Sequence, residues 1–347
     1  ELRPYFDFLE FIMENDVFQK IAKENEGLRL NAKKKRTTFL AIGVPLLILS
    51  LVLFVSQISL LELDNLTLIG AINVFALLFF ISSLVLLALG NLAKTKYQKG
   101  VLGQVQEAVE KELYTDLFKN PKSCLPLQMI LKPGFFARPD RYRGSNFVQA
   151  KHDGIYFDCS DFDLQRRQET RDSKGNTTVS YVTYSKGRMF HFVFERQFQK
   201  ELMVVEKTRF GTPRGKGLTK CETEYLEFNN KFAVFTSDDQ FVFYILTPQI
   251  QEKFLDLEKR NNGQFYFALL NNEIYLALEN NCAFPQPSLN EPLDEKALRS
   301  LGEQFAMPAL IIDELGLTKN KYKENAGISI NEENAGESQE NLKSSTN

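Results

Sequence analysis

Residues 37–61 read TTFLAIGVPLLILSLVLFVSQISLL, and residues 66–93 read LTLIGAINVFALLFFISSLVLLALGNLA. Neither stretch contains a charged side chain. A helix needs about 20 apolar residues to cross a hydrocarbon core of about 30 Å, so each stretch predicts one membrane span. The short connector between them makes residues 37–93 a transmembrane hairpin with the lipid bilayer as its surroundings.

Charge on either side of the hairpin predicts its orientation. The connector carries Glu62 and Asp64 and no basic residue. Because basic flanks stay on the cytoplasmic side of a membrane, we expect a multi-pass protein with both termini in the cytoplasm. The flanking basic residues are Lys33, Lys34, Lys35, Arg36, Lys94, Lys96 and Lys99.

Composition limits the remaining possibilities. The chain has 347 residues, which is enough for the hairpin and about one further domain of ordinary size. Its formal net charge of -2 argues against a nucleic-acid binder. Cys124, Cys159, Cys221 and Cys282 form no C-x-x-C pair. Reduced thiols and no metal or cofactor are therefore expected, in agreement with a cytoplasmic domain.

Apolar residues at helical spacing continue on both sides of the hairpin. Residues 1–36 predict an N-terminal cytoplasmic amphipathic helix with a basic flank, and residues 94–120 predict a juxtamembrane amphipathic helix. Their amphipathic parts, Tyr5–Arg29 and Lys96–Phe118, would each be about 35 to 40 Å long at 1.5 Å per residue. We expect them to pair as an extension of the hairpin; the alternative is that each packs separately on the following domain.

Residues 121–318 are expected to form a cytoplasmic α+β domain. Prolines between residues 121 and 139 end the helical pattern, and the apolar period then changes to two. A long charged arm is predicted for residues 163–184, and a disordered tail for residues 319–347. Expected strands are residues 155–159, 179–184, 189–195, 202–206, 231–235, 241–246, 264–270 and 273–278. Expected helices follow Thr247-Pro248 and cover residues 294–305 and 309–315.

The predicted fold class is thus α+β: a two-helix transmembrane hairpin plus a cytoplasmic antiparallel-sheet domain with flanking helices. Within that domain, residues 221–239 (CETEYLEFNNKFAVFTSDD) and residues 244–248 (YILTP) resemble domain of unknown function 3137, an uncharacterised bacterial two-span membrane protein family. The resemblance extends over about residues 28–317. It implies a bacterial inner-membrane location and supplies no activity or catalytic residue. The charged arm and the acidic, Asn-rich tail depart from the family pattern.

Candidate site residues are few. Arg138, Arg141 and Arg143 lie in a segment expected to be irregular, where they would contact a ligand or lipid head groups; the alternative is a solvated loop. His152 and His191 are the only two histidines, and neither lies in a metal-binding or nucleophile motif. We therefore expect structural roles for both histidines and name no catalytic residue.

The functional prediction is a membrane-tethered cytoplasmic interaction or scaffolding module with a protein partner. One alternative is an enzyme acting on a lipid or membrane-delivered substrate, with carboxylates or His152 brought together by the fold. Another is a lipid head-group sensor that uses the three arginines. The sequence does not set the oligomeric state.

Overall fold

The computed structural model describes residues 15–60, 66–171, 175, 177–208, 217–260, 263–281 and 286–323. The chain divides into two compact units. The first unit comprises Glu1–Glu112 and Phe284–Ala306, and the second comprises Leu113–Ala283 and Met307–Asn347. Cys282, the connector between the apolar stretches and most of the expected tail lie outside the described residues.

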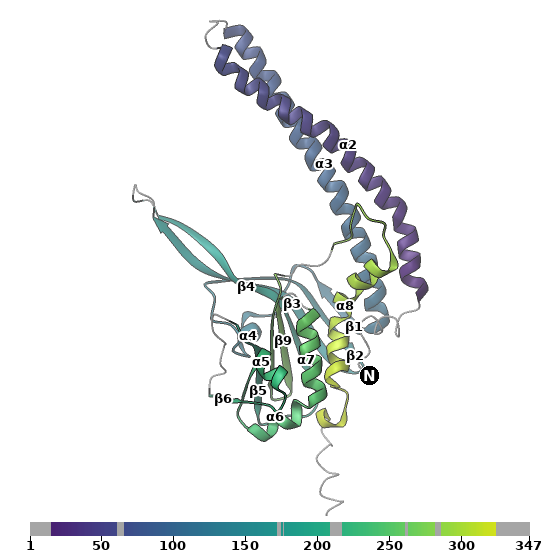
Figure 1. The fold of residues 1–347 in the computed structure, drawn as a ribbon, viewed down its shortest axis with the longest axis vertical. Coiled ribbons are helices and arrows are strands. Elements are labelled where there is room, and N and C mark those ends of the chain that lie inside the picture. Colours follow the sequence, from purple (N-terminus) through teal and green to yellow (C-terminus); the bar gives the residue numbers. More distant parts are fainter. Residues whose placement is uncertain are drawn as a thin grey trace, which may run out of the picture. The chain divides into compact units, whose positions relative to one another are not determined.

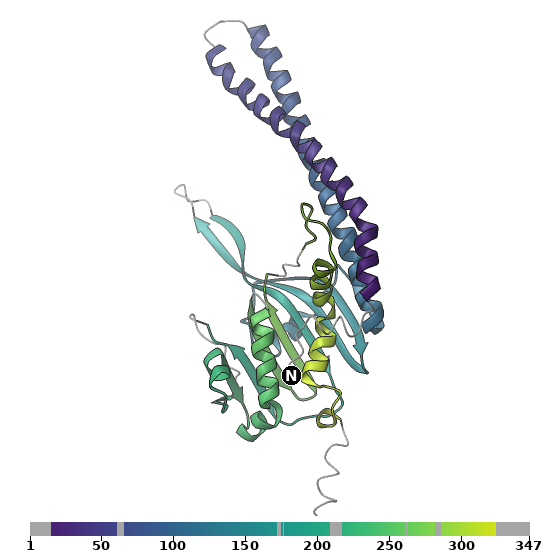
Figure 2. The ribbon, with the colours of Figure 1, turned by 45° about the vertical axis from the view of Figure 1, so that its right-hand side comes forward.

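The first unit is built on two long helices, α2 (Asn15–Leu60) and α3 (Leu66–Leu113), which lie side by side (Figure 2). Each helix joins an amphipathic segment to an apolar stretch without a break. Both are long and apolar enough to cross a membrane, and only 11% of the most apolar window of each is buried. A Cβ added at Gly43 would lie 3.3 Å from the Leu86 Cβ, so the helices approach closely in their apolar halves.

The expected pairing of the two amphipathic segments is confirmed. The Asn25 side-chain amide donates to the Gln104 side chain at 2.5 Å, and Val101 and Val105 are fully buried. The same helix pair holds residues 286–293, because Arg29 donates to the Leu289 carbonyl at 2.8 Å. This segment was predicted to belong to the α+β domain, and its hydrogen bonds to α2 place it in the first unit instead.

The juxtamembrane helix was predicted to reach residue 120, and that boundary is wrong. Helix α3 ends at Leu113, and residues Thr115–Asn120 form strand β1. Asp116 adopts a positive φ of 53°, which an α-helix does not allow, and β1 then pairs antiparallel with β2. The sequence has no glycine or proline at the break; the first proline after Leu113 is Pro121, eight residues later.

The second unit contains a nine-stranded sheet in the order β1-β2-β3-β4-β9-β8-β5-β7-β6. Every neighbouring pair is antiparallel, as the fold class predicts. The remaining strands are β2 (Arg141–His152), β3 (Ile155–Arg171), β4 (Thr177–Val193), β5 (Glu201–Glu206), β6 (Thr219–Cys221), β7 (Phe232–Thr236), β8 (Gln264–Leu270) and β9 (Glu273–Glu279).

Both faces of the central part of the sheet are buried. On one face, Met189 and Met203 belong to a core cluster with Ile130 of the short helix α4 (Leu127–Leu131). On the opposite face, α7 (Pro248–Arg260) packs Phe254 against Phe265 and Phe267 of β8, at centroid distances of 5.2 and 5.0 Å. Figure 1 shows α7 in front of the sheet and α4 behind it. Aromatic side chains from both faces therefore supply much of the apolar core.

Strands β3 and β4 continue beyond the sheet as a two-stranded ribbon (Figure 1). The pairing of β2 with β3 stops at Arg141–Gln165, and a bulge follows Leu164 at the point where the ribbon leaves the sheet. Residues 166–171 and 177–182, here called the arm, pair only with each other and are exposed. The predicted exposed arm is thus confirmed for the outer half of two long strands, whereas Leu164 and Gln165, within the predicted residues 163–184, are buried.

Two predictions for the C-terminal half are wrong. Residues 241–246 were expected to be a strand but belong to helix α6 (Asp239–Ile245), because Asp238 accepts a hydrogen bond from the Phe241 N–H at 3.1 Å and caps the helix. The two helices expected over residues 294–315 are one helix, α8 (Glu295–Leu315), with Pro308 inside it. The N–H of the next residue, Ala309, donates to the Tyr114 hydroxyl at 3.5 Å.

The disordered tail was predicted to begin at residue 319, which is too early. Residues Asn320–Tyr322 form a 3-10 helix, η2, and Tyr322 is buried against Phe194 at a centroid distance of 5.1 Å. The folded part of the chain therefore extends past residue 318, because an aromatic side chain anchors it to the sheet. Residues 324–347 lie outside the described residues.

Candidate functional site

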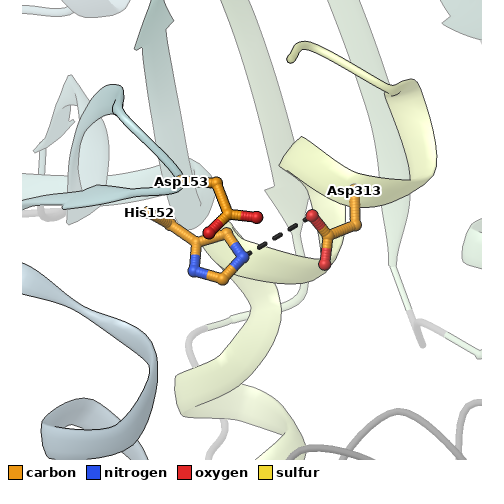
Figure 3. A group of neighbouring side chains, drawn as sticks. All are labelled: His152, Asp153 and Asp313. Carbon is orange, nitrogen blue, oxygen red and sulfur yellow. Dashed lines mark ion pairs between the residues drawn. The ribbon is translucent and has the colours of Figure 1, made fainter. Parts of the chain in front are cut away.

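A cluster of metal-ligating residue types forms where β2 turns into β3. His152 is the last residue of β2, and the two-residue connection Asp153-Gly154 has φ values of 46° and 80°. Two positive φ values in a two-residue hairpin are typical of a type I′ turn, which favours Asp-Gly. The turn brings Asp153 beside His152, and Asp313 of α8 faces the same ring (Figure 3).

The His152 ring is held in one orientation. Its Nδ1 lies 2.8 Å from the backbone carbonyl oxygen of Leu113, and because a carbonyl only accepts, Nδ1 carries the proton. Leu113 is the last residue of α3, where carbonyl groups lack helical partners, so the contact also satisfies the helix end. Tyr114 packs edge-on against the ring at 6.2 Å.

The other ring nitrogen points toward the carboxylates. His152 Nε2 lies 3.5 Å from Asp313 Oδ1 and has no hydrogen-bond partner among the described residues. Burial lowers the pKa of His152, but Asp313 and the Leu113 carbonyl outweigh burial, so the net pKa lies above its ordinary value. The ring can therefore pair with Asp313 as a cation or offer a lone pair as a neutral base.

The second histidine lies in a different polar network, inside the core. His191 is 4% exposed, and its Nδ1 lies 3.0 Å from Asp158 Oδ1 on the neighbouring strand. On the other side, Nε2 lies 3.7 Å from Glu273, which accepts a hydrogen bond from the Tyr275 hydroxyl at 2.8 Å. This row ties β3, β4 and β9 together, in agreement with the structural role predicted for His191.

Electrostatic interactions favour the charged form of the Glu273 carboxylate in this network. Burial raises the pKa of Glu273, but the Lys132 ammonium and the Tyr275 hydroxyl outweigh burial, so its net pKa is lowered. Because the two carboxylates contact opposite nitrogens of His191, they do not converge on one point as metal ligands would. The network is a buried cross-strand contact.

The three candidate arginines do not form the predicted irregular loop. Arg141 and Arg143 lie in strand β2 and share a face, while Arg138 precedes the strand. The Arg141 guanidinium stacks over the Tyr181 ring of the arm at 5.1 Å, and Arg143 lies opposite Asp163 in the sheet. Both side chains are exposed. The strand assignment was missed because β2 is rich in polar residues, although the Asp153-Gly154 turn signals a hairpin.

The basic residues that flank the apolar stretches all lie within the two long helices. Lys33, Lys34, Lys35 and Arg36 are part of α2, and Lys94, Lys96 and Lys99 are part of α3. Because the two helices lie side by side, both groups fall at the same end of the apolar section (Figure 2). This arrangement is the one that the orientation rule for membrane helices requires.

Comparison with known proteins identifies one family. Residues 183–317 match a family described as protein of unknown function, DUF3137, a narrower region than the expected 28–317. No curated protein matches the chain. A crystal structure of the mycobacterial trehalose monomycolate transport factor A is similar at 10% sequence identity. The similarity covers 59% of this chain and 94% of that one with a TM-score of 0.34, which is too low to define fold or function. The region from the end of the arm to just past the end of α8 is therefore similar to the DUF3137 family.

Proposed function

We propose that this protein is a bacterial inner-membrane protein with two spans, whose second unit, which contains the sheet and the arm, lies in the cytoplasm and binds a protein partner. The arm is the binding element in this proposal. The enzyme alternative would need a catalytic group at a substrate site, whereas the exposed arm needs only a partner of complementary shape and charge.

The membrane assignment is supported by the surfaces of α2 and α3. Their apolar side chains remain open to the surroundings, among them Phe54 at 65% and Leu92 at 62% exposure. Apolar exposure on this scale is unfavourable in water and favourable in lipid. The basic residues of both helices lie at one end, which supports a cytoplasmic location for both flanks.

The observation that carries the interaction proposal is the arm. It contributes no side chain to the sheet core, and it exposes Val179, Tyr181 and Val182 by 44%, 43% and 48%. Its outer backbone edges pair with no other strand among the described residues. An open backbone edge can pair with a strand of a partner protein. The exposed β-branched and aromatic side chains of the arm, which lie next to arginines, would contact the side chains of that strand.

A photo-crosslinking experiment tests this role of the arm. A photoreactive amino acid at Val182 should give a protein adduct of one defined mass in native membranes. The matched control is the same amino acid at Phe243 of α6, which is 50% exposed, and it should give no such adduct. Substitution of Tyr181 and Arg166 by Ala should reduce the Val182 adduct, because these side chains border the position.

Mass spectrometry of the adduct separates the candidate functions. A protein adduct at Val182 alone supports the interaction module. Phospholipid adducts at Val182, at Arg141 and at Arg143 would favour the head-group sensor instead. Equal protein adducts at Val182 and Phe243 would contradict a specific role for the arm.

A further inference from the structure

We propose that His152, Asp153 and Asp313 form a binding site for a divalent transition-metal ion such as Zn²⁺. The three residues come from two segments that are far apart in the sequence, the β2–β3 turn and the C-terminal part of α8 (Figure 3). Both segments belong to the second unit of the chain. The site is independent of the proposed role of the arm.

The state of His152 is the first argument. The side chain is only 7% exposed, yet its Nε2 makes no hydrogen bond to any described residue. A buried polar atom without a partner is costly, and an ion that accepts its lone pair removes that cost. Metal-binding histidines ordinarily donate the other ring N–H to a backbone carbonyl or carboxylate. The bond from His152 Nδ1 to the Leu113 carbonyl is of this kind.

The spacing of the donor atoms is the second argument. The 3.5 Å between His152 Nε2 and Asp313 Oδ1 exceeds the length of an N–H···O hydrogen bond. Zinc bonds of about 2.0–2.2 Å at tetrahedral angles place two ligand atoms about 3.4 Å apart. One ligand atom from each of the three residues lies within 4.8 Å of the other two. Small movements of the two exposed carboxylates would therefore complete three ligand positions around one ion.

Charge and donor chemistry indicate the kind of ion. A neutral imidazole and two carboxylates carry a combined charge that balances a divalent cation. Nearby cations have other partners, since Lys151 pairs with Asp116 at 2.9 Å and Lys253 pairs with Glu314. An imidazole nitrogen favours zinc and related transition metals, whereas Mg²⁺ and Ca²⁺ prefer all-oxygen sites. The exposed side of the site leaves room for water as a further ligand.

Zinc titration of the full chain in lipid nanodiscs, after treatment with a chelator, tests the site. Calorimetry should detect saturable zinc binding, and Mg²⁺ should not compete. Asp313→Asn and Asp153→Asn should each weaken zinc binding by about 10-fold or more. Glu303→Gln, about ten residues earlier on the same helix, is the matched control and should leave the affinity unchanged. The substituted carboxylates are exposed, so folding should be retained.

Histidine NMR signals provide a second readout that does not depend on affinity. The chain contains only two histidines, so the ring signals of His152 and His191 can be followed separately. Zinc should shift the His152 signals and leave those of His191 in place, which also reports that the fold is intact. Unchanged His152 signals at saturating zinc, or equal weakening by Glu303→Gln and Asp313→Asn, would overturn the proposal.

Discussion

Phe192→Ala is expected to lower the free energy of unfolding of the domain by about 3 to 5 kcal/mol. Phe192 is fully buried in β4, the central strand between β3 and β9. It lies opposite Phe157 on one side and Ile274 on the other. Truncation removes apolar contacts and leaves a cavity on the buried face of the sheet, which the paired strands cannot fill. Urea denaturation of the full chain, followed by circular dichroism, measures the loss.

The control for this variant is the arm on the same two strands. Replacing residues 167–178 with an Asn-Gly turn should change the unfolding free energy little, because the removed side chains that the structure describes, at 167–171, 175, 177 and 178, are exposed. Cross-strand pairs in an isolated ribbon contribute only about 0.2–1 kcal/mol each, and a hairpin alone is marginally stable. Similar large losses from both variants would contradict the division of β3 and β4 into a core half and an exposed half.

The second large effect is expected at Gly187, where β4 passes the end of β9. A Cβ added there would lie 2.0 Å from the Leu278 carbonyl oxygen and 2.8 Å from the Glu279 Cα. These are backbone atoms of a paired strand, so they cannot turn aside as a side chain would. Gly187→Ala should therefore cost about 3 kcal/mol or more, at the upper end of the usual cost of overpacking.

Gly103→Ala is the matched control. Gly103 is an exposed helical residue of α3, and a Cβ there would meet nothing within 4 Å. Alanine should be neutral or stabilising by about 1 kcal/mol, since glycine is the weaker helix former. Thermal unfolding of both variants provides the comparison. A Gly187→Ala protein as stable as Gly103→Ala would be inconsistent with the close approach of β4 and β9.

The parts of the fold that could be predicted from sequence are those with long uninterrupted patterns. The two apolar stretches exceed the length of ordinary core helices, so their helical state followed from length alone. The strands rich in Phe, Val and Ile around residues 202–206 and 264–278 also agree with β5, β8 and β9. In these segments, local preference and burial favour the same structure.

Errors arose where two patterns compete. Residues 241–246 (FVFYIL) are a short continuous run of large apolar and aromatic side chains, which favours a strand, but Phe241, Val242 and Ile245 are the buried residues, with helical spacing. The hydrogen bond from the Phe241 N–H to the Asp238 side chain stabilises the start of the helix. Strand β2 was missed for the opposite reason: its polar residues are only partly buried, so its apolar pattern is weak.

The candidate metal site could not be predicted from the sequence. His152 and Asp153 are adjacent in sequence, but Asp313 reaches them only because α8 packs near the β2–β3 turn within the second unit. No local motif encodes this approach. The Asp153-Gly154 hairpin signal could have located the turn, but the buried, unsatisfied Nε2 of His152 is visible only in three dimensions.

The central proposal is that α2 and α3 are membrane spans that hold the sheet domain on the cytoplasmic side. Cysteine labelling with a membrane-impermeant reagent in spheroplasts tests it most directly. Asn65→Cys, in the connector, should react without permeabilisation. Leu226→Cys, at a position that is 71% exposed, should react only after detergent is added. The wild-type chain measures background from its own cysteines. Labelling of Leu226→Cys in sealed spheroplasts, with Asn65→Cys protected, would contradict the account.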